Sequence, residues 1–123
     1  MSMADGWIGV DLDGTLAELH EWQGPSHIGK PIPAMVDRVR GWLAQGLDVR
    51  ICTARVATGK GHSMAEALEA RVAITTFCVE QFGTALPITA QKDYQMIELW
   101  DDRAVTVETN TGKVIGRSRV GLE

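Results

Sequence analysis

The sequence predicts an α/β fold in which a mostly parallel sheet carries helices on both faces. Three observations predict it: short apolar runs rich in branched residues, longer stretches with helical spacing between them, and the resulting strand, helix, strand, helix, strand order. Such connections form right-handed βαβ units. A chain of 123 residues forms one domain, so we assign 1–123 to a single domain, with its core motifs in 7–104 and a C-terminal hairpin at 104–117.

The first strand is predicted over residues 7–12, a short apolar run that stops abruptly at Asp13-Gly14-Thr15. Its carboxyl end therefore carries acidic side chains. Residues 16–31 follow, in which glycines and prolines are scattered among polar groups, and they are interpreted as a loop that could contain a short hairpin. This loop could lie over whatever the end of the strand binds.

Two helices are predicted. The first has Pro33 in its first turn and ends before Gly46, with apolar residues at helical spacing between them. The second opens with Ser63 and Glu66, which have the spacing of a capping box, and Gly83 closes it. We expect the inner face of the second helix to consist of side chains at helical spacing: Met64, Leu68, Val72, Thr75, Val79 and Phe82.

The remaining strands are predicted from short runs after each helix. Charged and apolar residues alternate over 47–52, just before Thr53. Further candidates cover 86–89 and 96–100, and alternating valines around the turn residues 110–112 predict a terminal β-hairpin. Only about seven residues separate the third strand from the fourth, whereas a parallel crossover usually needs about a dozen. Either the third strand is misassigned or this connection is unusually tight.

Composition and charge exclude several classes of protein. The net charge of −4 should repel polyanions, so a nucleic-acid partner would need a local basic patch. No apolar run approaches the ~18–20 residues that span a bilayer, and the N-terminal stretch lacks the order of a signal peptide, so we expect a soluble cytoplasmic protein without a membrane partner. Cys52 and Cys78 lack the paired spacing of a zinc or redox site and are expected to be buried free thiols.

Polar residues follow three of the predicted strands. Asp11 and Asp13 end the first, Thr53 follows the second, and Asp101 and Asp102 follow the fourth. In a parallel sheet the carboxyl ends of the strands meet at one edge, where ligands bind. We therefore expect these side chains to form one site.

The residue types at this edge favour phosphoryl chemistry with a metal. Close carboxylates repel each other unless a cation lies between them, and Mg²⁺ suits one or two carboxylates plus a substrate phosphate. Asp11 and Asp101 would be ligands, and Asp13 could add its backbone carbonyl. Asp11 could then attack phosphorus to give an aspartyl-phosphate, while Asp13 acts as general acid and base. Thr53 and Lys92 could stabilise the phosphoryl oxygens.

Together, Asp-Leu-Asp-Gly-Thr at 11–15, Thr53 after an apolar strand, Lys92 and Asp101-Asp102 resemble the motifs of the haloacid dehalogenase-like (HAD) phosphatase superfamily. The resemblance covers roughly residues 7–104 and implies a Rossmann-like three-layer sandwich and a Mg²⁺-dependent phosphatase. Dehalogenase members lack the second aspartate, so Asp13 implies phosphate chemistry. The implied roles are nucleophile for Asp11, acid/base for Asp13, phosphate-binding hydroxyl for Thr53, stabilising lysine for Lys92, metal ligand for Asp101 and second acidic member for Asp102.

Family members often carry a cap domain, but here the two intervals where caps are inserted, about 16–32 and 56–86, hold a loop and one helix. Such a capless member resembles those that act on large substrates or borrow a neighbouring subunit as a lid. The implied partners are a phosphorylated small molecule, an accessible phosphate on something bulky, or a second copy in a homo-oligomer. The strings at 53–55 and 101–103 also resemble those of nucleotide and polynucleotide phosphatases, although the acidic balance argues against a long nucleic acid.

Several alternatives stay open. Arg55 and Lys60 are the alternative phosphate-binding cations if Lys92 does not reach the site, and Arg55 is counted with Thr53 and Lys92 as substrate-binding. His20, Trp22 and His27, in the loop after the first motif, could touch a substrate or a partner subunit, or simply pack the loop. A non-catalytic phosphate- or metal-binding module on the same fold is the second functional hypothesis.

Overall fold

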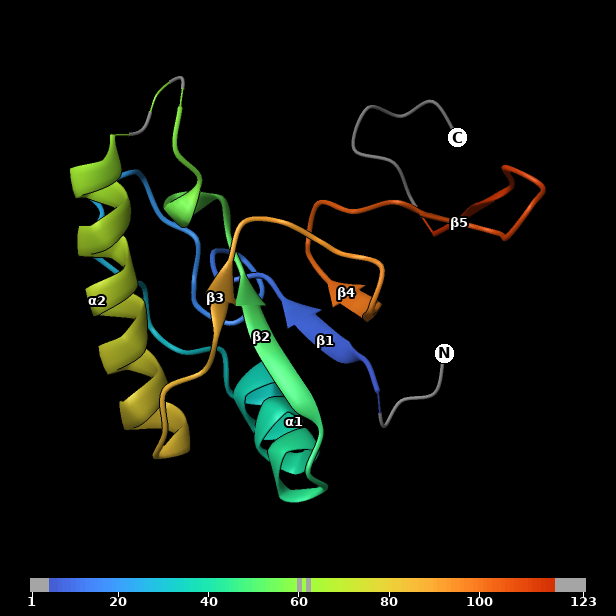
Figure 1. The fold of residues 1–123 in the computed structure, drawn as a ribbon, viewed down its shortest axis with the longest axis horizontal. Coiled ribbons are helices and arrows are strands. Elements are labelled where there is room, and N and C mark those ends of the chain that lie inside the picture. Colours follow the sequence, from blue (N-terminus) through green and yellow to red (C-terminus); the bar gives the residue numbers. More distant parts are fainter. Residues whose placement is uncertain (1–4, 60, 62, 117–123) are drawn as a thin grey trace.

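The computed structural model describes residues 5–59, 61 and 63–116. Its centre is a four-stranded parallel sheet in the order β3-β2-β1-β4 (Figure 1). The strands are β1 (Trp7–Val10), β2 (Asp48–Cys52), β3 (Ile88–Thr89) and β4 (Met96–Trp100). The predicted α/β class and parallel sheet are confirmed. All four residues of the central strand β1 are buried, so the residues that follow it emerge from the middle of the sheet.

The two helices are α1 (Pro33–Ala44) and α2 (Met64–Phe82), where the sequence predicted them. Pro33 opens α1, because the missing N–H of proline is not needed in the first turn. Ser63 and Glu66 form the predicted capping box of α2. Gly83 closes α2 in the left-handed conformation, with φ of 76°.

Both helices cover the same face of the sheet. Ile8 and Val10 of β1 pair with Val49 and Ile51 of β2, so these four side chains point to one side. They belong to one core cluster with buried residues of α1 and α2. The expectation of helices on both faces is therefore not met in the part of the chain that the structure describes. Successive right-handed crossovers from β1 to β2 to β3 run in one direction, which places both helices on one side.

On the opposite face, the segment that leads from β3 to β4 contacts the start of β1. Trp7 on this face is only 1% exposed, with the Arg50 guanidinium 4.7 Å from its ring centroid. Its indole Nε1 donates to Asp93 at 2.8 Å, and its backbone N–H donates to the carbonyl of Gln95 at 3.0 Å. Residues 90–95 thus run back along the sheet to the start of β4. The connection is tight, and the third and fourth strands both exist.

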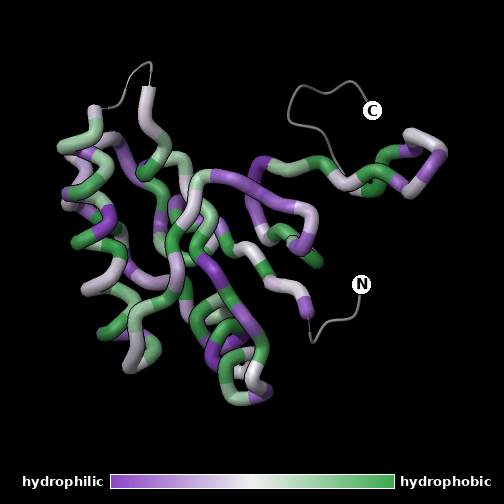
Figure 2. The backbone as a smooth tube through the Cα atoms, in the orientation of Figure 1, coloured by the Kyte–Doolittle hydropathy of each residue, from purple (hydrophilic) through white to green (hydrophobic). Residues whose placement is uncertain are grey.

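The inner face of α2 differs from the prediction. Its buried residues are Ala67, Ala70, Ile74, Phe77 and Cys78. Four of the residues predicted to face inward are instead 49–69% exposed, namely Met64, Leu68, Val72 and Val79. Apolar residues recur around α2 (Figure 2), so helical spacing fits two faces, and the face with two alanines lets the helix approach its neighbours closely. Among the described helices, none is long and apolar enough to cross a membrane.

The predicted terminal hairpin is confirmed. β5 (Thr106–Val107) pairs antiparallel with β6 (Val114–Ile115) around a turn in which Asn110 has φ of 67° and Gly112 has φ of 78°. Its strands form a sheet of their own, away from α2 (Figure 1). The last predicted residue of the hairpin, 117, lies outside the described residues.

Candidate active site

Three carboxylates meet at the carboxyl edge of the sheet. Asp11 follows β1, while Asp101 and Asp102 follow β4, the parallel neighbour of β1. The backbone N–H of Asp11 donates to the carbonyl of Trp100 at 2.9 Å, which extends the pairing of the two strands by one residue. One carboxylate oxygen from each aspartate lies within 4.8 Å of the other two. We call these three residues the acidic triad.

The turn at 13–15 positions Asp102 in this triad. Gly14 has φ of +89°, and a Cβ there would lie 2.5 Å from Asp102 Oδ2, so no other side chain fits without displacing the carboxylate. Thr15 Oγ1 donates to Asp102 Oδ1 at 3.3 Å and accepts from the Asp102 backbone N–H at 3.1 Å. Gly14 and Thr15 of the first motif therefore fix the position of Asp102, which lies 87 residues from Thr15 in the sequence.

Asp11 has an altered acidity in this environment. Burial, the nearby charge of Asp101 and a hydrogen bond shared with Asp102 raise the pKa of Asp11 from 3.8 to about 7, although a hydrogen bond from the backbone of Leu12 opposes the shift. A cation between the carboxylates would relieve this repulsion and favour the ionised form. Three clustered carboxylates are hard oxygen donors, so the donor set fits Mg²⁺.

The edge of the sheet opens into a cavity of about 730 Å³. Asp11, Asp13, Thr53, Arg55 and Asp101 line it, so five of the predicted site residues face one space. The lining also includes residues that sequence reasoning did not select: Glu18, Leu19, Glu21, Gln23, Gly29, Ala54, Ala57, Ala90 and Arg103. Most of them are adjacent in sequence to a selected residue, and this adjacency is the signal that could have identified them as part of the site.

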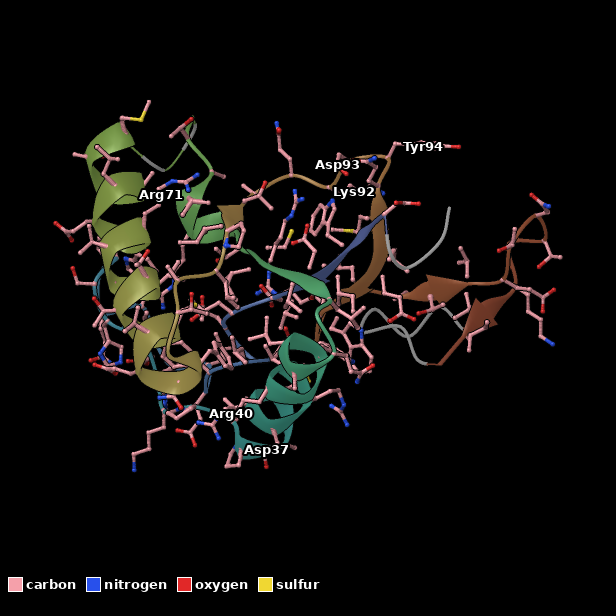
Figure 3. The ribbon with its side chains drawn as sticks, turned by 60° about the horizontal axis from the view of Figure 1, so that its bottom comes forward. Asp37, Arg40, Arg71, Lys92, Asp93 and Tyr94 are labelled. Atoms are coloured by element: carbon pink, nitrogen blue, oxygen red, sulfur yellow. The ribbon has the colours of Figure 1, made fainter. Side chains whose placement is uncertain are left out.

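Lys92 and Asp102 are not in the lining of this cavity. Lys92 is exposed and lies in the segment 90–95, next to Asp93 and Tyr94 (Figure 3). Asp93 is fixed against Trp7 at the start of β1, at the opposite end of that strand from Asp11. Lys60, an alternative cation, lies outside the described residues.

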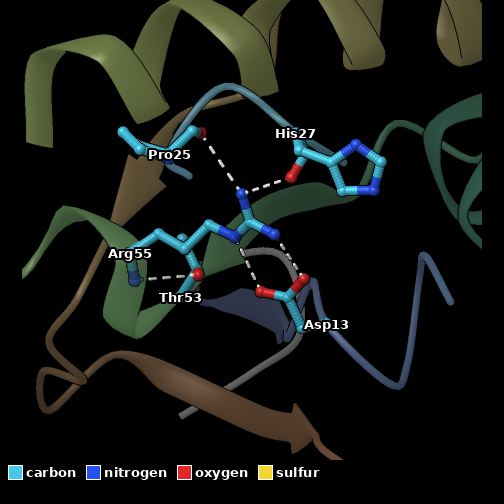
Figure 4. Close-up of polar contacts among 5 residues, drawn as sticks. All are labelled: Asp13, Pro25, His27, Thr53 and Arg55. Atoms are coloured by element: carbon cyan, nitrogen blue, oxygen red, sulfur yellow. Dashed lines mark hydrogen bonds and ion pairs between the residues drawn. The ribbon is translucent and has the colours of Figure 1, made fainter. Parts of the chain in front are cut away.

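Arg55 lines the cavity and is paired with Asp13. Its Nε and Nη2 donate to the two carboxylate oxygens of Asp13, each at 2.8 Å, and its Nη1 donates to the carbonyls of Pro25 and His27 at 3.2 and 2.6 Å (Figure 4). The guanidinium also lies 5.0 Å from the ring centroid of Trp22. Arg55 is buried, and this bidentate pairing is the strongest geometry that an arginine and a carboxylate can adopt. It joins Asp13 to the loop 16–31.

Thr53 and Cys52 complete the β2 side of the cavity. Thr53 is 3% exposed, and its hydroxyl accepts from the backbone N–H of Arg55 at 3.2 Å, which caps the short 3₁₀ helix η1 (Ala54–Val56). Accepting this bond leaves the hydroxyl hydrogen to donate to a ligand. Cys52 is half-buried rather than buried as expected, and burial, followed by the charges of Asp11 and Asp101, raises the pKa of its thiol. Cys78 is buried and free, as predicted.

No protein-family model matches this chain. Neither the curated proteins nor the solved structures compared with it contain a match. The fold and the site therefore describe a small α/β protein with a parallel four-stranded sheet and an acidic triad at its carboxyl edge.

Proposed function

We propose that this protein is a magnesium-dependent phosphohydrolase of the haloacid dehalogenase-like kind, which cleaves phosphate monoesters through an aspartyl-phosphate on Asp11. One observation carries the proposal. Asp11 emerges from the central strand into a cavity, within 4.8 Å of two further carboxylates from the neighbouring strand. Carboxylates so close together are unfavourable without a cation.

The acidic triad would hold the metal, with Asp11 and Asp101 as carboxylate ligands and Asp102 beside them. Bound there, Mg²⁺ would neutralise the charges of the carboxylates and of a substrate phosphate. Thr15 and Gly14 support this arrangement because they fix Asp102 from the first motif. The backbone carbonyl of Asp13 remains a proposed additional ligand.

The proposed reaction has two steps, which the residues of the cavity carry out. Asp11 Oδ attacks phosphorus and the bond from phosphorus to the leaving oxygen breaks, while Asp13 gives that oxygen a proton. In the second step Asp13 takes a proton from water, whose oxygen bonds to phosphorus as the bond to Asp11 breaks. The Thr53 hydroxyl donates to a phosphoryl oxygen. Lys92 is proposed for the same role, which requires its side chain to reach the cavity.

A second candidate function is a non-catalytic phosphate- or metal-binding module. Two observations favour it: both oxygens of Asp13 accept from Arg55, and Lys92 does not line the cavity. A bidentate pairing with Arg55 competes with proton transfer, because protonating an Asp13 oxygen weakens its bond to Arg55. In the same arrangement four hydrogen bonds of the Arg55 guanidinium go to Asp13 and the loop rather than to a substrate.

Phosphate release from a broad panel of phosphate esters tests the proposal, with and without Mg²⁺, for the parent protein and for Asp11→Asn. We expect magnesium-dependent release that the substitution abolishes. Asp37→Asn, an exposed carboxylate on α1 outside the cavity lining, is the matched control and should leave release unchanged. If no ester releases phosphate while Mg²⁺ still binds, the binding module is the correct function.

A further inference from the structure

The cavity is much larger than a phosphoryl group needs. Its volume of about 730 Å³ falls within the ~300–1,000 Å³ range of small-molecule pockets. At about 30 Å³ per water molecule, this space would hold roughly two dozen waters, so a phosphoryl group fills a small part of it. The remaining space is available to the leaving group.

One wall of the cavity is aromatic. The loop 16–31 contributes Leu19, His20, Trp22 and His27 to the lining. Leu19 and Trp22 are 55% and 57% exposed, and the rings of His20 and His27 face each other edge to face with centroids 6.4 Å apart. Large apolar side chains left exposed in a cavity indicate a binding surface for an apolar group, and the Trp22 ring suits a flat one.

This wall is held in place by the rest of the protein. Two backbone hydrogen bonds close the base of the loop, Glu18 to Lys30 at 2.8 Å and Ile32 to Leu16 at 2.9 Å. The Arg55 guanidinium holds two carbonyls of the loop and lies against the Trp22 ring. Because the aromatic wall is already ordered, a ligand that stacks on it loses little free energy to loop ordering.

The charges around the aromatic wall suit hydroxyl and amino groups better than further phosphates. Glu18 and Glu21 belong to the same lining, and carboxylates accept hydrogen bonds from hydroxyl or amino groups. They would repel a second or third phosphate, as would the net charge of −4. The lining holds five carboxylates and two guanidinium groups, and Arg55 is already paired with Asp13, so the cavity favours a monophosphate over a polyphosphate or a long nucleic acid.

Building on the proposed phosphohydrolase activity, we propose that the substrate is a phosphate monoester whose leaving group carries hydroxyl groups and a flat aromatic ring system, as a nucleoside 5′-monophosphate does. Trp22 is the stacking residue and determines specificity. A base stacked on an aromatic side chain binds roughly 5- to 150-fold more tightly than one without that contact.

The test compares kcat/KM for adenosine 5′-monophosphate and for ribose 5-phosphate, which has the same sugar and phosphate without the base. We expect the nucleotide to be preferred by roughly 10- to 100-fold. Trp22→Leu should lower the ratio of the two values about tenfold or more, whereas Trp22→Phe should keep most of it. Tyr94→Leu removes another aromatic ring, 95% exposed and outside the cavity lining, and should leave the ratio unchanged.

The outcomes separate the two proposals. Equal kcat/KM values for the two substrates, or a Trp22→Leu variant that lowers both values equally, would overturn the stacking role while leaving the phosphohydrolase in place. If neither compound, nor any other ester, releases phosphate, the proposed function fails. Calorimetric titration with the same two compounds then decides: tighter binding of the nucleotide that Trp22→Leu weakens supports the aromatic site, and equal affinities refute it.

Discussion

The pairing of Arg55 with Asp13 makes a quantitative prediction about stability. Arg55→Met removes a guanidinium that makes four hydrogen bonds, two to Asp13 and two to carbonyls of the loop 16–31. Methionine fills similar space without donors. The substitution therefore leaves a carboxylate and two carbonyls without these donors.

The expected destabilisation follows from the burial of the pair. The side chains of Arg55 and Asp13 are 9% and 25% exposed. Removing one partner of a buried ion pair costs about 3–5 kcal/mol, and we expect about 3 kcal/mol because water reaches part of the Asp13 carboxylate. Arg55→Lys keeps the charge but loses the planar fork, so we expect a smaller loss of about 1–2 kcal/mol.

Urea denaturation measures these values. With an m value of about 1–3 kcal/mol/M, a loss of 3 kcal/mol lowers the midpoint by roughly 1–3 M. A double-mutant cycle with Asp13→Asn should give a double variant that is clearly less destabilised than the sum of the single variants. An Arg55→Met variant within about 0.5 kcal/mol of the parent, or an additive cycle, would refute the reasoning.

Three further predictions concern the acidic triad and the helix α2. Gly14→Ala should destabilise the protein by about 1–3 kcal/mol, because the φ of residue 14 is positive. It should also weaken Mg²⁺ binding in calorimetry, because the Cβ of the alanine would displace the Asp102 carboxylate, and unchanged binding would contradict this. Ile74→Ala should cost about 2–5 kcal/mol in urea denaturation, whereas Val72→Ala, 69% exposed, should stay within about 0.5 kcal/mol; equal losses would contradict the observed helix face. Without metal, stability should fall as pH rises from about 4 to about 7, because the pKa of Asp11 is raised in the folded state and the unfolded chain releases its proton first. Asp11→Asn should flatten this part of the pH profile, and a variant with the same profile as the parent would contradict the account. At a Mg²⁺ concentration ten times the Kd, the metal should stabilise the parent protein by about 1.4 kcal/mol.

The sequence predicted the parts of the site that depend on local patterns. Asp11, Thr53 and Asp101 each follow a short apolar run, and such runs identify strands without knowledge of the tertiary structure. Because parallel strands end at one edge, it followed that these residues share a site. The capping box and the proline and glycine at helix ends located the helices for the same reason.

The missed features depend on choices that local patterns leave open. α2 has apolar residues on two faces, so periodicity alone could not select Ile74 over Val72. Asp13 and Arg55 are 42 residues apart, and their pairing depends on how η1 follows β2. The sequence shows that the connection 90–95 is short, but its course along the face that no described helix covers depends on the tertiary structure. The order of the motifs along the sequence likewise does not determine whether the Lys92 side chain reaches the cavity. A homo-oligomer stays a prediction, which sedimentation velocity would test.

The central claim is that Asp11 carries the phosphoryl group, and covalent trapping tests it most directly. The protein is mixed with Mg²⁺ and a phosphate ester that it hydrolyses, quenched in acid, and reduced with borohydride, which converts an aspartyl-phosphate to homoserine. Peptide mass spectrometry should then find homoserine at position 11 in the parent protein and none in parent samples prepared without substrate. Magnesium-dependent turnover without any modification at position 11, or with modification at a different carboxylate, would contradict the account.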